Sequence, residues 1–187
     1  GIDSNVTNFY LDDMVADATP QKIEKRLVFM GKWKRADNFD GLKWFFDNVY
    51  DKISKDFKIS IIGKWLPENF VTYVESMSNV EYLGFVDNPY EIITNSTATV
   101  SPIFSGAGVK VKVVETLACG TPVIGNDIAF EGISTVFEAF MIHADTPNDY
   151  AEEINNMKIT LKERIDFKNR FMANYQNQLI SNYINSL

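Results

Sequence analysis

Short apolar runs alternate along this chain with longer segments in which apolar side chains recur every three or four positions. Apolar runs of a few residues that end at glycine, proline or polar residues are typical of buried strands. Six such runs predict six short strands, at residues 26–30, 57–62, 80–86, 98–100, 122–124 and 140–142.

The segments between these runs predict helices, at residues 37–53, 67–77, 109–118 and 159–186 and from starts near residues 88 and 146. Asp37 stands where an N-cap would open the first helix, and Thr146 with Asp149 has the spacing of a capping box. We therefore expect these polar side chains to mark the points where helices begin.

Strands that alternate with helices predict βαβ units and a parallel sheet that is covered on both faces. The expected fold is α/β, a doubly wound, Rossmann-like sheet of about six strands, whose ligands bind beyond the carboxyl ends of the strands. Residues 1–24 are more polar and weakly patterned, so we expect a lead-in or interdomain linker there and one domain over residues 25–187.

Composition and charge exclude several classes of function. The chain of 187 residues carries 18 basic and 25 acidic side chains, a formal charge of −7, which argues against nucleic acid as a partner. A single cysteine excludes an internal disulfide framework and a zinc site with several thiolates. No apolar run is long enough to cross a bilayer and no signal-peptide pattern is present, so we expect a cytoplasmic chain without direct membrane insertion.

The residues with the clearest chemistry form a glycine-rich segment between the fourth strand and the next helix. Gly106 and Gly108 flank Ala107, which leaves backbone N–H groups open to a ligand near a helix start with partial positive charge. Lys112 adds a cation, and Glu115 shares its helix face. The pattern suits the diphosphate and ribose of a nucleotide, although a tight turn and a helical ion pair are the plainer alternatives.

A longer pattern surrounds this segment and consists of Pro102, residues 106–110, Lys112, Glu115 and the runs 117–124 and 131–132. It resembles the C-terminal, donor-binding half of GT-B glycosyltransferases of family 4, also called group 1. The likeness continues more weakly upstream through the first three predicted strands, so that it covers residues 26–132.

This resemblance implies binding of a nucleoside-diphosphate sugar, linked to UDP or GDP, and transfer of the sugar to an acceptor in glycan or glycoconjugate biosynthesis. It implies a retaining hexosyltransferase in most cases, with the acceptor held by an N-terminal domain that this chain lacks. The chain alone is then expected to bind the donor without transferring it. No metal or other cofactor is implied, and any membrane association would come through the missing half.

The resemblance also implies which residues bind the donor, although it assigns no catalytic side chain. Glu115 is expected to hold the ribose, and the turn of Gly84, Phe85 and Val86 to line the base. The diphosphate is expected to meet the glycine-rich segment and nearby cations, namely Ser105, Gly106, Ala107, Gly108, Val109, Lys110, Lys112, Lys32 and Lys34.

The sequence departs from the family pattern at two positions. Many members carry a glutamate that touches sugar hydroxyls eight positions before the ribose glutamate, where this chain has Ala107. Asp37 stands where a lysine is usual in the family, so either Lys34 or Arg35 is a candidate for the missing cation. The mode of sugar contact is therefore left open by the sequence.

Two functions other than that of a glycosyltransferase donor domain are also compatible with parts of this pattern. A nucleotide-sugar epimerase of the same architecture would share this half, and only the other half or its product would separate the two. A flavodoxin-like signalling module would need acidic residues after the first strand, whereas residues 31–35 are basic.

Histidine, cysteine, glutamate and tryptophan side chains elsewhere in the sequence are less clear candidates for the site. We expect His143 and Cys119 to be structural, and Glu131 to be as well suited to anchoring a loop as to touching a ligand. Trp33 and Trp65 follow the first two predicted strands and are minor site candidates.

Overall fold

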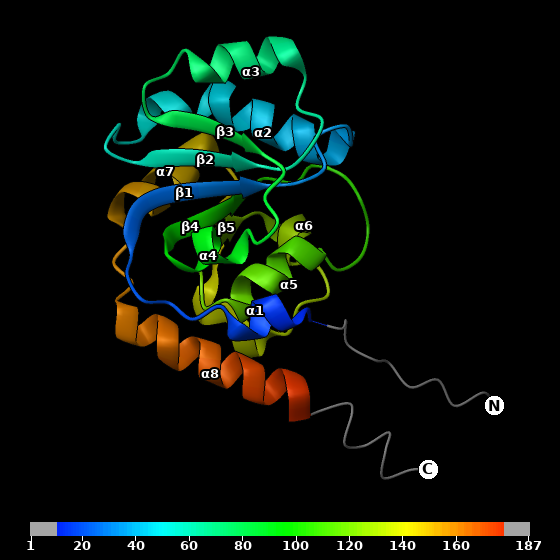
Figure 1. Cartoon of the computed structure of the whole chain (residues 1–187), viewed down its shortest axis with the longest axis vertical. Helices are drawn as coiled ribbons and strands as arrows, with labels where there is room; N and C mark the ends of the chain where they lie inside the picture. The colour runs from blue at the N-terminus through cyan, green and yellow to red at the C-terminus, as the bar shows by residue number, and fades with distance from the viewer. Residues whose placement is uncertain (1–10, 178–187) are drawn as a thin grey trace, which may run out of the picture.

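A computed structural model of the protein, which describes residues 11–177, contains one six-stranded sheet in which all neighbouring strands are parallel. The strands are β1 (Glu24–Met30), β2 (Lys58–Ile62), β3 (Val80–Gly84), β4 (Ser96–Ser101), β5 (Val123–Gly125) and β6 (Met141–His143). Their spatial order is β3-β2-β1-β4-β5-β6 (Figure 1). The predicted doubly wound α/β fold is confirmed, and β1 and β4 flank the point where the strand order reverses.

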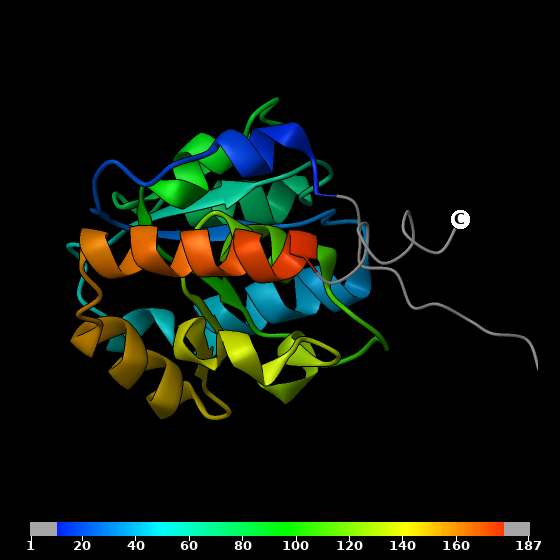
Figure 2. The same ribbon diagram turned by 90° about the horizontal axis from the view of Figure 1, so that it is seen from below.

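Helices cover both faces of the sheet (Figures 1 and 2). One face carries α2 (Ala36–Asn48), the 3₁₀ turn η1 (Tyr50–Lys52), α3 (Glu68–Glu75) and α7 (Pro147–Asn156). The other carries α1 (Asp13–Asp17), α4 (Tyr90–Thr94), α5 (Val111–Ala118), α6 (Asp127–Phe130), the 3₁₀ segment η2 (Thr135–Phe140) and α8 (Leu161–Asn177).

Alternation along the central strand divides the apolar residues between these two faces. Leu27 and Phe29 of β1 point into the layer with α2 and α3, whereas Val28 points into the layer with α5. All three side chains are almost fully buried. The short apolar runs therefore behave as expected for strands covered on both faces.

Local signals placed some helix ends correctly and others wrongly. Thr146 and Asp149 form the predicted capping box at the start of α7. Asp37 does not cap α2, because the helix begins at Ala36 with Arg35 as its N-cap, and the Asp37 carboxylate instead binds the Arg35 side chain. Arg35 is thus the main partner of this carboxylate, and the Asn38 backbone makes a smaller contribution.

The segment predicted as a plain lead-in contains α1, whose Val15 is completely buried against the α5 face. The predicted last helix is present as α8 up to Asn177, and its expected end lies outside the described residues. None of the helices in the described range 11–177 is long and apolar enough to cross a membrane.

Two buried basic side chains of α8 fasten this helix to the domain. Arg164 is fully buried and donates hydrogen bonds to the carbonyls of Ser96 and Gly120 and to the hydroxyl of Thr121. Lys168 donates to the carbonyls of Val15 and Ala16, at 3.1 and 2.8 Å, so that α8 also holds α1 in place. Figure 2 shows α8 lying across this face of the molecule. The polar tail of the sequence gave no sign of these anchors.

We expect Arg164→Met to destabilise the domain by about 3 kcal/mol or more, because it leaves three buried acceptors without their donor. Urea unfolding followed by tryptophan fluorescence measures this loss. Arg170→Met is the matched control on the same helix, since Arg170 is exposed, and it should change the free energy of unfolding by no more than about 0.5 kcal/mol. Equal effects of the two substitutions would contradict the anchoring role.

Candidate functional site

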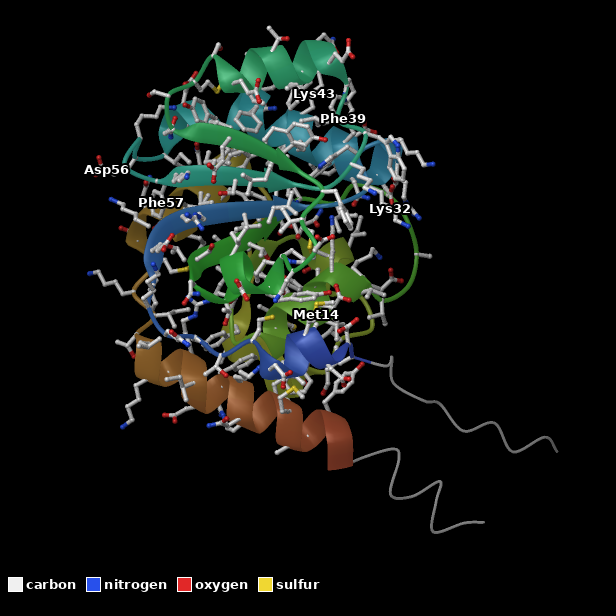
Figure 3. All side chains as sticks on the ribbon, viewed as in Figure 1. Met14, Lys32, Phe39, Lys43, Asp56 and Phe57 are labelled. Carbon is white, nitrogen blue, oxygen red and sulfur yellow. The ribbon has the colours of Figure 1, made fainter. Side chains whose placement is uncertain are left out.

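A cleft of about 820 Å³ opens at the carboxyl ends of the strands. Its walls come from the loops after β1, β2, β3 and β4 and from the start of α5, so that it lies beside the reversal of strand order. Figure 3 shows Lys32 at this end of the sheet, opposite the end where Asp56 and Phe57 precede β2. This is the location expected for ligands of a doubly wound sheet.

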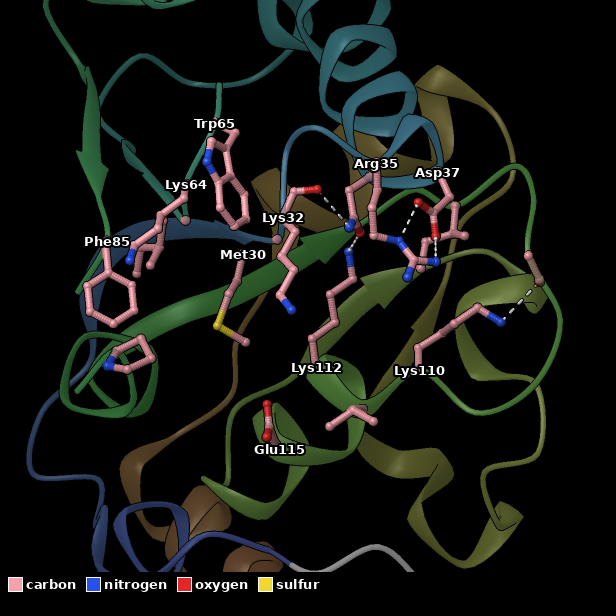
Figure 4. Close-up of a pocket in the computed structure, with 18 of the residues that line it drawn as sticks. Met30, Lys32, Arg35, Asp37, Lys64, Trp65, Phe85, Lys110, Lys112 and Glu115 are labelled. Atoms are coloured by element: carbon pink, nitrogen blue, oxygen red, sulfur yellow. Dashed lines mark hydrogen bonds and ion pairs between the residues drawn. The ribbon is translucent and has the colours of Figure 1, made fainter. Parts of the chain in front are cut away.

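The cleft brings together nine of the thirteen donor-binding candidates, from segments far apart in the sequence. They are Lys32, Phe85, Val86, Gly106, Ala107, Val109, Lys110, Lys112 and Glu115. Figure 4 labels Lys32, Phe85, Lys110, Lys112 and Glu115 among them. Gly84, Ser105 and Gly108 are next to lining residues but do not line the cleft themselves. Lys34 is also outside the lining, and its ammonium lies 4.4 Å from the centre of the Trp65 ring.

The glycine-rich loop depends on backbone angles that favour glycine. Gly106 and Gly108 have φ values of 102° and 80°, and α5 begins only at Val111. The N–H group of Gly108 donates to the Glu131 carboxylate at 2.9 Å. Glu131 therefore anchors the loop, which was one of its two expected roles.

Lys110 also stabilises the conformation of this loop. Its ammonium donates to the carbonyls of Gly106, at 3.2 Å, and of Gly108, and lies 3.4 Å from the Glu131 carboxylate. Three acceptors match the three protons of an ammonium group. By contrast, within the described residues the N–H groups of Gly106, Ala107 and Val109 donate no hydrogen bond to the protein. Those amides are free to meet a ligand.

Lys112 extends from α5 into the cleft, toward the loop after β1 (Figure 4). Its ammonium donates to the Asn38 side-chain oxygen at 2.8 Å. Burial lowers the pKa of Lys112 to about 8, while the nearby Asp37 carboxylate acts in the opposite direction. The group is charged at neutral pH but poorly hydrated, which suits it to binding an anion.

Arg35 and Asp37 form a two-pronged ion pair at the same end of the cleft. The Arg35 Nε and Nη2 donate to the two Asp37 oxygens at 3.0 and 2.8 Å. This hydrogen bonding holds the pKa of Asp37 below its usual range. Arg35 lines the cleft and Lys34 does not, so the geometry favours Arg35 as the basic residue that accompanies Lys32.

Glu115 lies one helical turn beyond Lys112, on the same face of α5. Burial raises the pKa of Glu115, and a hydrogen bond with Tyr90 partly offsets this effect. Tyr90 is buried, and the sequence did not predict it as a site residue. The sequence predicted only that a helix starts near residue 88.

The far end of the cleft is more apolar and carries an exposed aromatic ring. Phe85 is 62% exposed, and the Lys64 ammonium lies 3.9 Å from the centre of its ring. Trp65 is half exposed, lines the cleft and has a φ of 68°, which is unusual for a bulky residue. Lys64 follows the second strand as Lys32 follows the first, but it was not among the donor-binding candidates.

Three candidates prove to be structural. Cys119 is completely buried, and burial raises the pKa of its thiol to about 12. Trp33 is 3% exposed and belongs to the core. His143 lies outside the cleft lining, with its two ring nitrogens each 3.0 Å from a carboxylate, of Asp127 and of Glu138.

The Lys112 ammonium should lose its proton as the pH rises through about 8, and the cleft should then lose one positive charge. The Cε and Hε signals of Lys112 in ¹³C-labelled protein report this titration, identified by their loss in Lys112→Met. Asp37→Asn should lower the midpoint further, because it removes the carboxylate that favours the charged amine.

Asp40→Asn, on the exposed side of the same helix, should leave the Lys112 midpoint unchanged. A wild-type midpoint near about 10.4, the value of a solvated lysine, would contradict the buried position of the ammonium.

Comparison with known proteins gives a consistent result. The family model described as Glycosyl transferases group 1 matches residues 24–158. No curated protein sequence matches the chain.

Several solved glycosyltransferase structures share the fold at low sequence identity. AviGT4, involved in avilamycin A biosynthesis, is 17% identical with a TM-score of 0.58, and the match covers 94% of this chain and 58% of AviGT4. TarM of S. aureus is 17% identical with a TM-score of 0.69, over 91% of this chain and 36% of TarM. HepE of Anabaena, in complex with UDP and glucose, is 15% identical with a TM-score of 0.61, over 87% of this chain and 48% of HepE.

The chain thus spans 36–58% of the length of these three proteins. Their structures agree with its parallel sheet, and the family model covers most of its residues. On this basis the chain belongs to the glycosyl transferases group 1 family.

Proposed function

We propose that this chain is the donor-binding domain of a glycosyltransferase and that its cleft holds a nucleoside-diphosphate sugar. The observation that carries the proposal is that α5 presents on one face a partly buried ammonium, from Lys112, and a carboxylate one turn further along, from Glu115. Lys112 stands beside free backbone amides and other cations, whereas Glu115 stands toward the apolar end of the cleft. In a nucleoside diphosphate the charged diphosphate is followed by the hydroxyl groups of the ribose. The diphosphate therefore matches the cationic part of the cleft, and the ribose matches Glu115.

In the proposed complex the diphosphate lies against Lys32, Lys112 and the N–H groups of Gly106, Ala107 and Val109. Charged donors and fixed amides bind phosphate oxygens more strongly than neutral side chains do. Lys110 acts indirectly, by holding the loop that presents these amides. We therefore give Lys110 a supporting role in place of direct phosphate contact.

The two ends of the nucleoside have separate partners in this proposal. Glu115 accepts hydrogen bonds from ribose hydroxyls, and the Tyr90 contact holds its carboxylate in place. The base lies toward Phe85 and Val86 at the apolar end, where an exposed ring offers a stacking surface. HepE and the pneumococcal enzyme GtfA, both structurally similar to this chain, have been solved with UDP together with glucose and GlcNAc respectively.

Sugar transfer itself also needs an acceptor. Because the chain spans 36–58% of its structural relatives, we propose that a further domain supplies the acceptor site and that this chain alone binds the donor without transferring it. When the sugar departs, negative charge grows on the diphosphate. Lys32, Lys112 and the loop amides are placed to stabilise that charge, and we propose that they do so without a metal ion.

The proposal is tested by calorimetric titration of the 187-residue chain with UDP, GDP, ADP and inorganic pyrophosphate. At least one of the three nucleoside diphosphates should bind more tightly than pyrophosphate. Glu115→Ala should weaken binding of that nucleotide about tenfold and leave pyrophosphate binding unchanged, because only the nucleotide carries ribose hydroxyls.

Glu131→Gln is a useful comparison, since its effect through the glycine-rich loop should weaken pyrophosphate and nucleotide alike. If the folded wild-type chain binds none of the three nucleotides, the donor-binding proposal is wrong. Equal losses for nucleotide and pyrophosphate in Glu115→Ala would remove the ribose assignment alone.

A further inference from the structure

Acidic side chains line the cleft at two separate places. Among the described residues that line it, only Asp37 and Glu115 are acidic, whereas five are basic. Figure 4 shows Arg35, Lys32 and Lys112 between the two carboxylates. The cleft therefore presents a carboxylate, then cations, then a second carboxylate.

Asp37 faces the glycine-rich loop. One of its carboxylate oxygens lies 3.8 Å from the point where a side chain on Gly106 would begin. Of the two small loop residues that line the cleft, Gly106 has no side chain and Ala107 offers only a methyl group. Of the two acidic residues that line the cleft, Asp37 is the one beside Gly106, whereas Glu131 binds the Gly108 amide and does not line the cleft.

The Asp37 carboxylate still has room for a ligand. Arg35 occupies one position on each of its two oxygens, while an ionised carboxylate offers about four acceptor positions in all. The Asn38 backbone also contributes a hydrogen bond, but the side chain is 24% exposed and lines the cleft, so part of it is accessible to a ligand. The Arg35 pair keeps the carboxylate ionised and fixes its orientation, so that it acts as a pure acceptor.

A nucleoside-diphosphate sugar has the complementary order, with hydroxyl groups of the ribose and of the sugar on opposite sides of a diphosphate. We infer that Asp37 accepts hydrogen bonds from hydroxyl groups of the transferred sugar, as Glu115 does from the ribose. This inference rests on the proposed function and adds the side chain that recognises the sugar. Arg35 then has two tasks, to orient Asp37 and to contact the phosphate nearer the sugar.

The simpler alternative is that Asp37 only orients Arg35 and does not contact the donor. The two roles differ in what they predict for the two halves of the donor. If Asp37 serves only Arg35, its loss weakens a nucleoside diphosphate and the corresponding nucleotide sugar equally. If Asp37 touches the sugar, its loss also removes the extra affinity that the sugar confers, so the conjugate is weakened more than the nucleoside diphosphate.

The experiment compares the nucleoside diphosphate that binds best with its own sugar conjugates, for example UDP with UDP-glucose and UDP-N-acetylglucosamine, or GDP with GDP-mannose. Calorimetric titration gives the ratio of the two affinities for each protein. We expect the wild-type chain to bind at least one conjugate more tightly than the parent nucleotide. Asp37→Asn should reduce that ratio about tenfold, because any loss that acts through Arg35 or Lys112 falls on the nucleotide and its conjugate alike and cancels in the ratio.

Arg35→Ala and Asp40→Asn complete the set. Arg35→Ala should weaken the parent nucleotide as well as its conjugate, and Asp40→Asn should change neither, since Asp40 lies outside the cleft. Circular dichroism verifies that each variant is folded.

The inference is overturned if the wild-type chain binds the nucleotide and every conjugate with equal affinity, or if Asp37→Asn leaves the ratio unchanged. A failure of the nucleotide itself to bind would instead overturn the proposed function, so the two failures can be told apart.

Discussion

The site depends on one close approach between backbones, at Gly41 of α2. A side chain on Gly41 would begin 1.8 Å from the carbonyl oxygen of Pro102, the residue that follows β4. No Cβ fits in that space, so the helix reaches the loop only because the residue is glycine. A glycine inside a helix costs roughly 1 kcal/mol relative to alanine. In return, the first turn of α2 with Asp37 and Asn38 lies against Lys112 and the glycine-rich loop.

An acidic protein forms a basic cleft here because the cations of several separate segments are gathered in one place. The chain carries a net charge of −7, yet five basic and two acidic side chains line the cleft. The cations come from the loops after β1 and β2 and from the loop and helix after β4, which are separate in sequence and meet only at the ends of adjacent strands. Burial of Lys112 adds to the effect, because a poorly hydrated ammonium has more to gain from a phosphate.

The fold was predictable from the sequence because strand alternation and helical spacing are local properties, and the parallel sheet follows from their order. Much of the cleft lining was predictable as well, because the glycine-rich segment and its helix are contiguous. The anchoring role of Arg164 could not be predicted, because its three hydrogen-bond acceptors lie 43 to 68 positions away in the sequence. The pairing of Arg35 with Asp37 was missed for another reason: a carboxylate near a helix start has two possible partners, and the sequence suggested the backbone.

The central claim is that the diphosphate of a nucleotide binds to the amides of the glycine-rich loop and to Lys112. Amide chemical shifts of ¹⁵N-labelled protein, recorded during a titration with UDP or GDP, test it most directly. We expect the largest changes at Gly106, Ala107, Val109 and the first turn of α5, with smaller ones near Phe85. Saturable changes confined to residues outside the cleft, or no change at millimolar nucleotide with the protein folded, would contradict it.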